Sequence, residues 1–150
     1  MNLDRLKAML RTDEGTRLRR YRCPAGHWTI GYGWNIDANP LPPEIAAYER
    51  VNGQITAKQA EELLDISAEA AVRQARGVYP DLDSYSETRQ LAIVDFVFNV
   101  GPSTAARFRD TNAAIQAGDW EEAARGFEDS LWYRQVGDRA KRLVAMIREG

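Results

Sequence analysis

Three side chains that could share acid–base chemistry lie close together near the N-terminus. They are Glu14, Cys23 and Thr29, in the stretch "DEGTRLRRYRCPAGHWTIGYG" that runs from Asp13 to Gly33. Eight residues separate the glutamate from the cysteine, and five separate the cysteine from the threonine. A carboxyl group can donate a proton, a thiolate can act as a base or nucleophile, and a hydroxyl can hold a water molecule. Taken alone, a glutamate just before a helix-ending glycine is more typical of an ordinary surface residue.

Glu14 follows an expected helix. Leu3, Leu6, Met9 and Leu10 recur at helical spacing, which predicts a helix over residues 2–12 that Gly15 ends. The negative end of the helix dipole disfavours ionisation of a carboxyl there. A carboxyl that keeps its proton is what a general acid needs.

Cys23 and Thr29 fall in a segment of different periodicity. Apolar residues alternate with polar ones between residues 16 and 36, with glycines and Pro24 between them, which predicts a small antiparallel sheet with a turn at "CPAG". Pro42 and Pro43 suit the start of a helix over "EIAAYERV". Thr56 and Gln59 form a capping box for a helix of about 20 residues.

Helical patterns dominate the rest of the chain. The segment "ETRQLAIVDFVFNVG" is apolar almost all round and predicts a buried helix, and "TNAAIQAGDWEEAARGFEDS" and "RAKRLVAMIRE" predict further helices. We therefore expect an α+β fold in a single domain. Its parts are a sheet lobe over about 13–55, a linking helix over about 56–77, and a helical lobe over about 78–150 that includes the N-terminal helix. A cleft between the lobes is the expected place for a ligand.

Composition narrows the classes of function. The chain has 150 residues, 44% hydrophobic and 28% charged, and its net charge of −2 argues against generic nucleic-acid binding. Two arginine-rich clusters, at 17–22 and 134–148, fit either a solvated face or contact with an anionic polymer. One cysteine and one histidine make a metal site improbable, and no cofactor is expected. No secretion signal or membrane-spanning stretch is visible, so we expect a protein that is made in the cytoplasm without stable membrane insertion.

Several motifs in order resemble those of the phage-type lysozymes, the family 24 glycoside hydrolases that tailed phages use as endolysins. The pattern "DEG-x-R-L-x-x-Y-x-C-P-A-G-x-W-T-I-G-Y-G" carries the resemblance, together with "ITAKQAEELL", "FVFNVG" and "WYRQVGDRAKR". It extends over essentially the whole chain. The sequence is also similar to the T-even type within that family, with a shorter C-terminus.

The resemblance implies a catalytic set of Glu14, Cys23 and Thr29. Here Cys23 stands where the familiar family pattern has aspartate, and Trp34 stands where "GYGH" is frequent. Glu14 would be the acid, and the Thr29 hydroxyl would hold the attacking water. Three roles stay open for Cys23: positioning or activating that water, direct attack that gives a thioglycosyl intermediate, or a small half-buried hydrophobe.

Other residues receive roles from the resemblance or remain ambiguous. The family pattern pairs Arg139 with the catalytic glutamate and assigns Phe98 and Thr111 to substrate binding, although Phe98 would also suit plain core packing. Asp95 is either a buried hydrogen-bonded residue or a catalytic one, with the first favoured. The remaining ambiguous residues are an expected exposed turn residue and three aromatics that suit either sugar stacking or the core: His27, Trp28, Tyr32 and Trp34.

These expectations describe an endolysin: a monomeric muramidase that binds peptidoglycan glycan strands and hydrolyses the β-1,4 bond between N-acetylmuramic acid and N-acetylglucosamine. It would be made in the host cytoplasm and reach the wall through lesions formed by a separate holin. Two alternatives remain: a lytic transglycosylase, which needs a single acid, and a non-catalytic peptidoglycan-binding relative.

Overall fold

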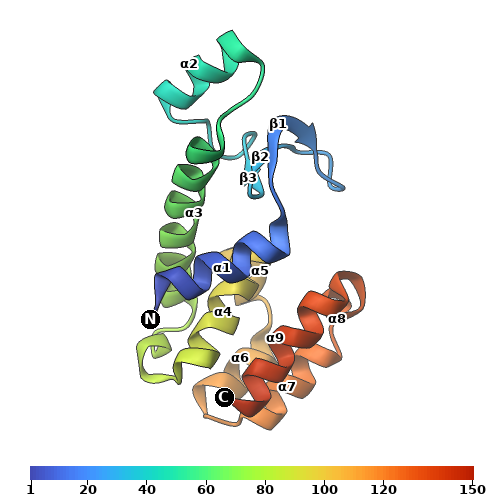
Figure 1. Ribbon diagram of the computed structural model, residues 1–150. Coiled ribbons are helices and arrows are strands. Elements are labelled where there is room, and N and C mark those ends of the chain that lie inside the picture. The colour runs from blue at the N-terminus through green and yellow to red at the C-terminus, as the bar shows by residue number, and fades with distance from the viewer. The chain divides into compact units, whose positions relative to one another are not determined.

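The computed structural model describes residues 1–150 and confirms the predicted α+β class (Figure 1). The N-terminal half contains α1 (Leu3–Glu14), β1 (Arg17–Arg22), β2 (Trp28–Gly31), β3 (Trp34–Asn35), α2 (Pro43–Asn52) and α3 (Ala57–Val78). The C-terminal half contains the 3-10 turn η1 (Leu82–Ser84), α4 (Glu87–Val100), α5 (Pro102–Ala106), α6 (Arg109–Gln116), α7 (Trp120–Glu128), α8 (Leu131–Val136) and α9 (Asp138–Glu149).

The chain divides into two compact units. One unit comprises residues 7–69, and the other comprises residues 1–6 and 70–150. Both divisions fall inside helices, in α1 and in α3, so each of these helices contributes to both units. The predicted single domain with its three parts stays a prediction.

The 7–69 unit contains the sheet. Its strands follow one another in the order β1-β2-β3, and both pairs are antiparallel. Tyr21 pairs with Thr29 and Arg22 with Trp28, and a bulge interrupts the register between Arg17 and Tyr21. The predicted turn joins β1 to β2: the Gly26 N–H donates to the Cys23 carbonyl oxygen at 2.8 Å.

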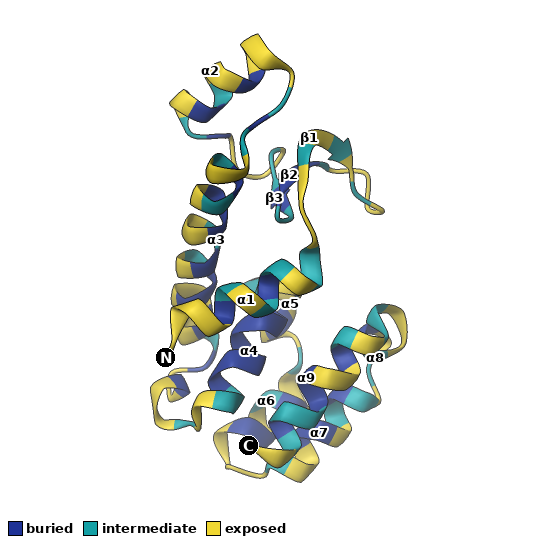
Figure 2. Cartoon of the chain, in the orientation of Figure 1, coloured by how far each residue is buried: buried dark blue, intermediate teal, exposed yellow.

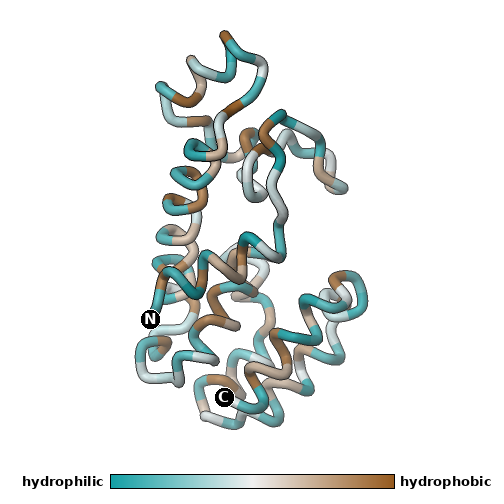
Figure 3. The backbone as a smooth tube through the Cα atoms, in the orientation of Figure 1, coloured by the Kyte–Doolittle hydropathy of each residue, from teal (hydrophilic) through white to brown (hydrophobic).

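A small apolar core supports this sheet. Its buried members come from the sheet, α2, the segments on either side of α2 and the first turns of α3: Ile30, Trp34, Leu41, Ile45, Ile55, Ala60 and Leu63. The predicted capping box is confirmed, because the Gln59 N–H donates to Thr56 Oγ1 at 3.0 Å and the Thr56 N–H donates to Gln59 Oε1 at 2.9 Å. The two bonds provide acceptors for the backbone N–H groups of Thr56 and Gln59 at the start of α3. Hydrophobic and hydrophilic segments alternate along α3, as expected for an amphipathic helix (Figure 3).

The larger unit is built around α4. Residues 90–97 of this helix are all buried (Figure 2), which confirms the prediction of a helix enclosed on all sides. The Phe96 ring meets three other aromatic rings edge-on at centroid distances of 4.9–5.0 Å, those of Phe108, Phe127 and Trp132. No helix of the structure combines the length and the apolar character that a membrane span requires.

Candidate active site

The second half of α1 is fixed to α3 by polar contacts. The Arg11 guanidinium donates to both carboxylate oxygens of Glu61, with Nε to Oε1 at 2.9 Å and Nη2 to Oε2 at 2.7 Å, and the Tyr32 hydroxyl donates to Glu61 Oε1 at 3.0 Å. Both hydrogen bonds lower the pKa of Glu61, that of Arg11 most strongly. Lys7 forms a further salt bridge with Asp65 at 2.9 Å. The end of α1, where Glu14 lies, is therefore held in place.

Glu14 is half-buried and lies directly against the turn between β2 and β3. A β-carbon built on Gly33 would come within 2.8 Å of Glu14 Oε2 and 3.2 Å of its Cδ. Gly33 also has a backbone φ of +74°, which residues other than glycine rarely adopt. Glycine is thus required here twice, for the backbone conformation and for the space that the carboxyl group occupies.

Cys23 directly follows β1, which ends at Arg22, and is half-buried. Its backbone N–H donates to the His27 carbonyl oxygen at 2.9 Å, which closes the turn. The backbone N–H of His27, followed by that of Ala25 and by the Thr29 hydroxyl, lowers the pKa of the Cys23 thiol below its ordinary value, against a smaller opposing effect of burial. The turn therefore favours the thiolate, the form that can accept a proton.

Thr29 lies beside Cys23, within hydrogen-bonding reach of its sulfur. Thr29 is only 4% exposed, and its Oγ1 donates to the His27 carbonyl oxygen at 2.9 Å. A hydroxyl has one proton, so it cannot donate to this carbonyl and to the sulfur at once. While the thiol is neutral, Thr29 can accept from it; when the thiolate forms, the hydroxyl can rotate and donate to the sulfur.

Tyr21 is a further candidate residue, which the sequence analysis did not single out. It pairs with Thr29 across the strands, and side chains of directly paired residues lie on one face of a sheet. The pKa of Tyr21 is raised, mainly by burial and also by the charges of Glu14 and Cys23. The Arg17 guanidinium, 4.3 Å from the ring centroid, opposes this increase. The Tyr21 hydroxyl is thus within electrostatic reach of both groups. The expected antiparallel pairing of the two segments on either side of the "CPAG" turn, which brings Tyr21 opposite Thr29, could have revealed it.

The two predicted substrate-binding residues belong to the other compact unit. Phe98 is half-buried near the end of α4. Thr111 is 6% exposed in α6, and a β-carbon built on Gly126 of α7 would come within 2.2 Å of its Oγ1. The Thr111 hydroxyl therefore fills the space that a side chain at Gly126 would need. Their roles in substrate binding stay predictions.

Arg139 also lies in that unit. Its Nε donates to Asp95 Oδ1 at 2.9 Å, and the Asp95 side chain is fully buried. The favoured interpretation of Asp95, a buried hydrogen-bonded residue, is thereby confirmed. The expected pairing of Arg139 with Glu14 stays a prediction.

The aromatic residues near the sheet have structural contacts. Trp34 is 9% exposed in the apolar core, and its Nε1 donates to the Asn39 carbonyl oxygen at 2.8 Å. The Arg22 guanidinium lies 4.4 Å from the Trp28 ring centroid. His27 is exposed, as predicted, and its Nδ1 lies 3.7 Å from Asp37 Oδ2. The structure holds no group of three or more His, Cys, Asp or Glu side chains suited to a metal ion.

Comparison with known proteins identifies the family and several relatives of this chain. A family model described as phage lysozyme matches residues 11–148. The chain is 32% identical over 157 residues to the Pre-baseplate central spike protein Gp5 of Enterobacteria phage T4, an alignment that covers 95% of this chain and 27% of that protein. It is 28% identical over 163 residues to Probable T4-type lysozyme 2 of Dictyostelium discoideum, which covers 97% and 94%. An Endolysin of Acyrthosiphon pisum secondary endosymbiont phage 1 is 30% identical over 121 residues, which covers 79% and 72%.

The chain belongs to the phage lysozyme family, because the family model matches nearly its whole length. The resemblance predicted from the motifs is thereby confirmed. Membership implies a lysozyme-type glycoside hydrolase with peptidoglycan as its substrate. The chain spans about a quarter of the T4 spike protein and most of the Dictyostelium lysozyme.

Proposed function

We propose that this chain is a muramidase that hydrolyses the β-1,4 bond between N-acetylmuramic acid and N-acetylglucosamine. One observation carries the proposal: in a member of the phage lysozyme family, a carboxyl group packed against Gly33 shares its unit with the hydrogen-bonded pair of Cys23 and Thr29. These groups supply a proton donor and a proton acceptor, which glycoside hydrolysis requires.

In the proposed reaction, Glu14 gives its proton to the glycosidic oxygen as the bond to the anomeric carbon breaks. A water molecule adds to the anomeric carbon and loses a proton to the Cys23 thiolate. Return of that proton to Glu14 through solvent restores both groups, so one water is consumed for each bond cut. The turn supports this use of Cys23, because its backbone N–H groups stabilise the thiolate.

Two substitutions separate the roles left open for Cys23. Cys23→Asp is expected to retain activity if the residue positions or activates water, because a carboxylate can do the same. Cys23→Ala is expected to lose most of the turnover. Full activity of the alanine variant would favour a packing role, and a mass increase on the protein during turnover would indicate a thioglycosyl intermediate.

The reaction type is tested on purified peptidoglycan, with reducing ends counted and the released fragments analysed by mass spectrometry. Hydrolysis gives new reducing ends and fragments that have gained one water for each bond cut. Fragments with a 1,6-anhydro end would instead identify a lytic transglycosylase. Binding of peptidoglycan without any release would identify a non-catalytic relative.

We further propose that the biological setting is host-cell lysis, with the chain made in the host cytoplasm and admitted to the wall by a holin. The relative named Endolysin supports this setting, since the alignment covers 72% of it. The chain produced alone in a bacterial host should leave the culture intact until a holin is co-produced. Prompt lysis without a holin would contradict this release route.

A further inference from the structure

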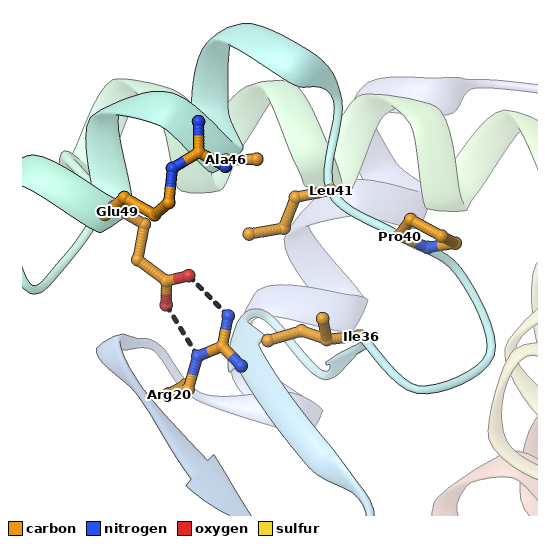
Figure 4. A pocket seen from close by; sticks show the side chains of 7 residues that line it. Arg20, Ile36, Pro40, Leu41, Ala46 and Glu49 are labelled. Atoms are coloured by element: carbon orange, nitrogen blue, oxygen red, sulfur yellow. Dashed lines mark hydrogen bonds and ion pairs between the residues drawn. The ribbon is translucent and has the colours of Figure 1, made fainter.

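A pocket unrelated to Glu14, Cys23 and Thr29 lies in the 7–69 unit, between the sheet and α2. It has a volume of about 370 Å³ and is lined mainly by Ile36, Leu41, Ala46, Arg20, Glu49 and Arg50. Figure 4 shows the labelled side chains of this lining around an open centre, with the Ile36 and Leu41 side chains facing into it. The volume falls in the range of small-ligand pockets.

The Arg20 guanidinium at this pocket is held in one orientation. Glu49 is 8% exposed and accepts from Arg20 Nε at 2.9 Å and from Nη2 at 2.5 Å. These two bonds use one edge of the planar guanidinium, and the third nitrogen lies on the side of Ile36 in Figure 4. A fixed guanidinium with spare donors is suited to bind a carboxylate.

Arg50 gives the pocket a positive balance. Among the residues that line the pocket, two guanidinium groups and one carboxylate leave a net charge of +1; Asp37, which is outside the lining, also acts on Arg20 by its charge. The carboxylate of Glu49 is already bonded to Arg20. The apolar side chains of Ile36, Leu41 and Ala46 offer a surface for methyl groups. The chemistry therefore fits a small anion that carries short apolar side chains beside its charge.

We propose that this pocket binds the carboxylate end of the short, alanine-rich peptides that peptidoglycan carries. The inference rests on the proposed function for the choice of ligand. The peptide carboxylate contacts Arg50 and the third nitrogen of Arg20, and alanine methyl groups pack on Ile36 and Leu41. The pocket thus recognises the peptide part of the wall, while Glu14, Cys23 and Thr29 act on the glycan.

Binding is tested with N-acetyl-D-alanyl-D-alanine as the probe and its C-terminal amide as the uncharged control. We expect the methyl NMR signals of Ile36, Leu41 and Ala46 to shift with the free acid, and the amide to bind about tenfold more weakly, since one charge-assisted hydrogen bond accounts for that difference. Equal binding of acid and amide, absence of binding, or shifts confined to other residues would overturn the proposal.

Variants assign the binding to the two arginines. Arg50→Gln is expected to weaken binding of the free acid about tenfold, whereas Arg19→Gln, which removes an exposed charge from the same unit outside the pocket, leaves it unchanged. Arg20→Gln alone would leave the Glu49 carboxylate without its partner. The contribution of Arg20 is therefore tested with the double variant Arg20→Gln/Glu49→Gln. Retained binding in Arg50→Gln and in the double variant would contradict the proposed contacts.

This experiment separates the two proposals. Peptide binding requires no turnover, so hydrolysis of peptidoglycan without binding of the dipeptide would leave the proposed function standing and remove the pocket from it. Binding without hydrolysis would have the opposite meaning. With an active enzyme, Arg50→Gln should raise KM on intact peptidoglycan and leave KM unchanged on glycan strands stripped of peptides.

Discussion

At the scale of single residues, the spacing of Glu14, Cys23 and Thr29 predicted a candidate site, and the structure places all three residues in the 7–69 unit. The contact between Cys23 and Thr29 follows from the pairing of two adjacent strands around a short turn. Gly33 could not be assigned in the same way, because its role depends on which glycine the Glu14 carboxyl approaches in space. Only the folded turn contains that information.

Reactivity of the single cysteine provides a residue-scale prediction. Because hydrogen bonds from the turn lower the pKa of Cys23, its alkylation by iodoacetamide should reach half-maximal rate at a lower pH than that of the same protein unfolded in urea. Thr29→Val removes one donor to the sulfur, so the folded midpoint should move to higher pH. Identical midpoints for folded and unfolded protein would contradict the stabilised thiolate.

A pair of glycine substitutions tests the packing of Glu14. Gly33→Ala and Gly26→Ala both place a side chain at a positive φ, of +74° and +86°, which costs about 1 kcal/mol of stability in each. Only Gly33→Ala puts a β-carbon against the Glu14 carboxyl, and displacing a catalytic group by about 1 Å can cost roughly 100-fold in rate. Denaturation and kcat are measured for both. Equal loss of kcat in the two variants would show that the contact with Glu14 is irrelevant.

At the scale of helices and strands, periodicity predicted the long elements well. The capping box located the start of α3, and the apolar pattern of α4 predicted its burial. Two short helices, α5 and α8, were missed because five or six residues give too little periodicity. The single helical pattern expected over 111–130 is two helices, α6 and α7, because Gly118, with a φ of +72°, lies between them. Helix α8 depends on a local cap, in which Ser130 Oγ accepts from the Tyr133 N–H at 3.2 Å.

Close packing of α6 on α7 provides the first element-scale prediction. Gly126→Ala should destabilise the protein by about 1–3 kcal/mol, since the new β-carbon meets Thr111 Oγ1. The control is Gly77→Ala in α3, where nothing lies within 4 Å and alanine should stabilise the helix by about 0.5 kcal/mol. Urea denaturation measures both. Adding Thr111→Ala to Gly126→Ala should restore stability, and failure to do so would contradict this packing.

The ion pair between Asp95 of α4 and Arg139 of α9 provides the second element-scale prediction. Arg139→Ala removes a partner from the fully buried Asp95 carboxylate, which should lower the free energy of unfolding by about 3 kcal/mol. Asp95→Asn/Arg139→Gln removes both charges and should lower it by less, because no buried charge loses its partner. A larger loss in the double variant would mean that the pair itself is not the main contribution.

At the scale of the whole molecule, composition gave few clues to function. A net charge of −2 and an ordinary apolar content fit most small proteins. The family was predicted from several motifs that occur in the expected order along the chain. The α+β architecture agrees with that family. The bounds of the two compact units could not be predicted from the sequence. They fall inside α1 and α3, where the helical pattern continues without interruption.

The most direct test of the account replaces the proposed proton donor, Glu14, alone. Glu14→Gln keeps the size of the side chain beside Gly33 and removes the acid, so the variant should fold with wild-type stability and bind peptidoglycan. Release of reducing ends from purified peptidoglycan is then measured for wild type and variant. The account predicts a loss of at least about 100-fold in kcat for the variant. A variant that releases reducing ends at the wild-type rate would contradict it.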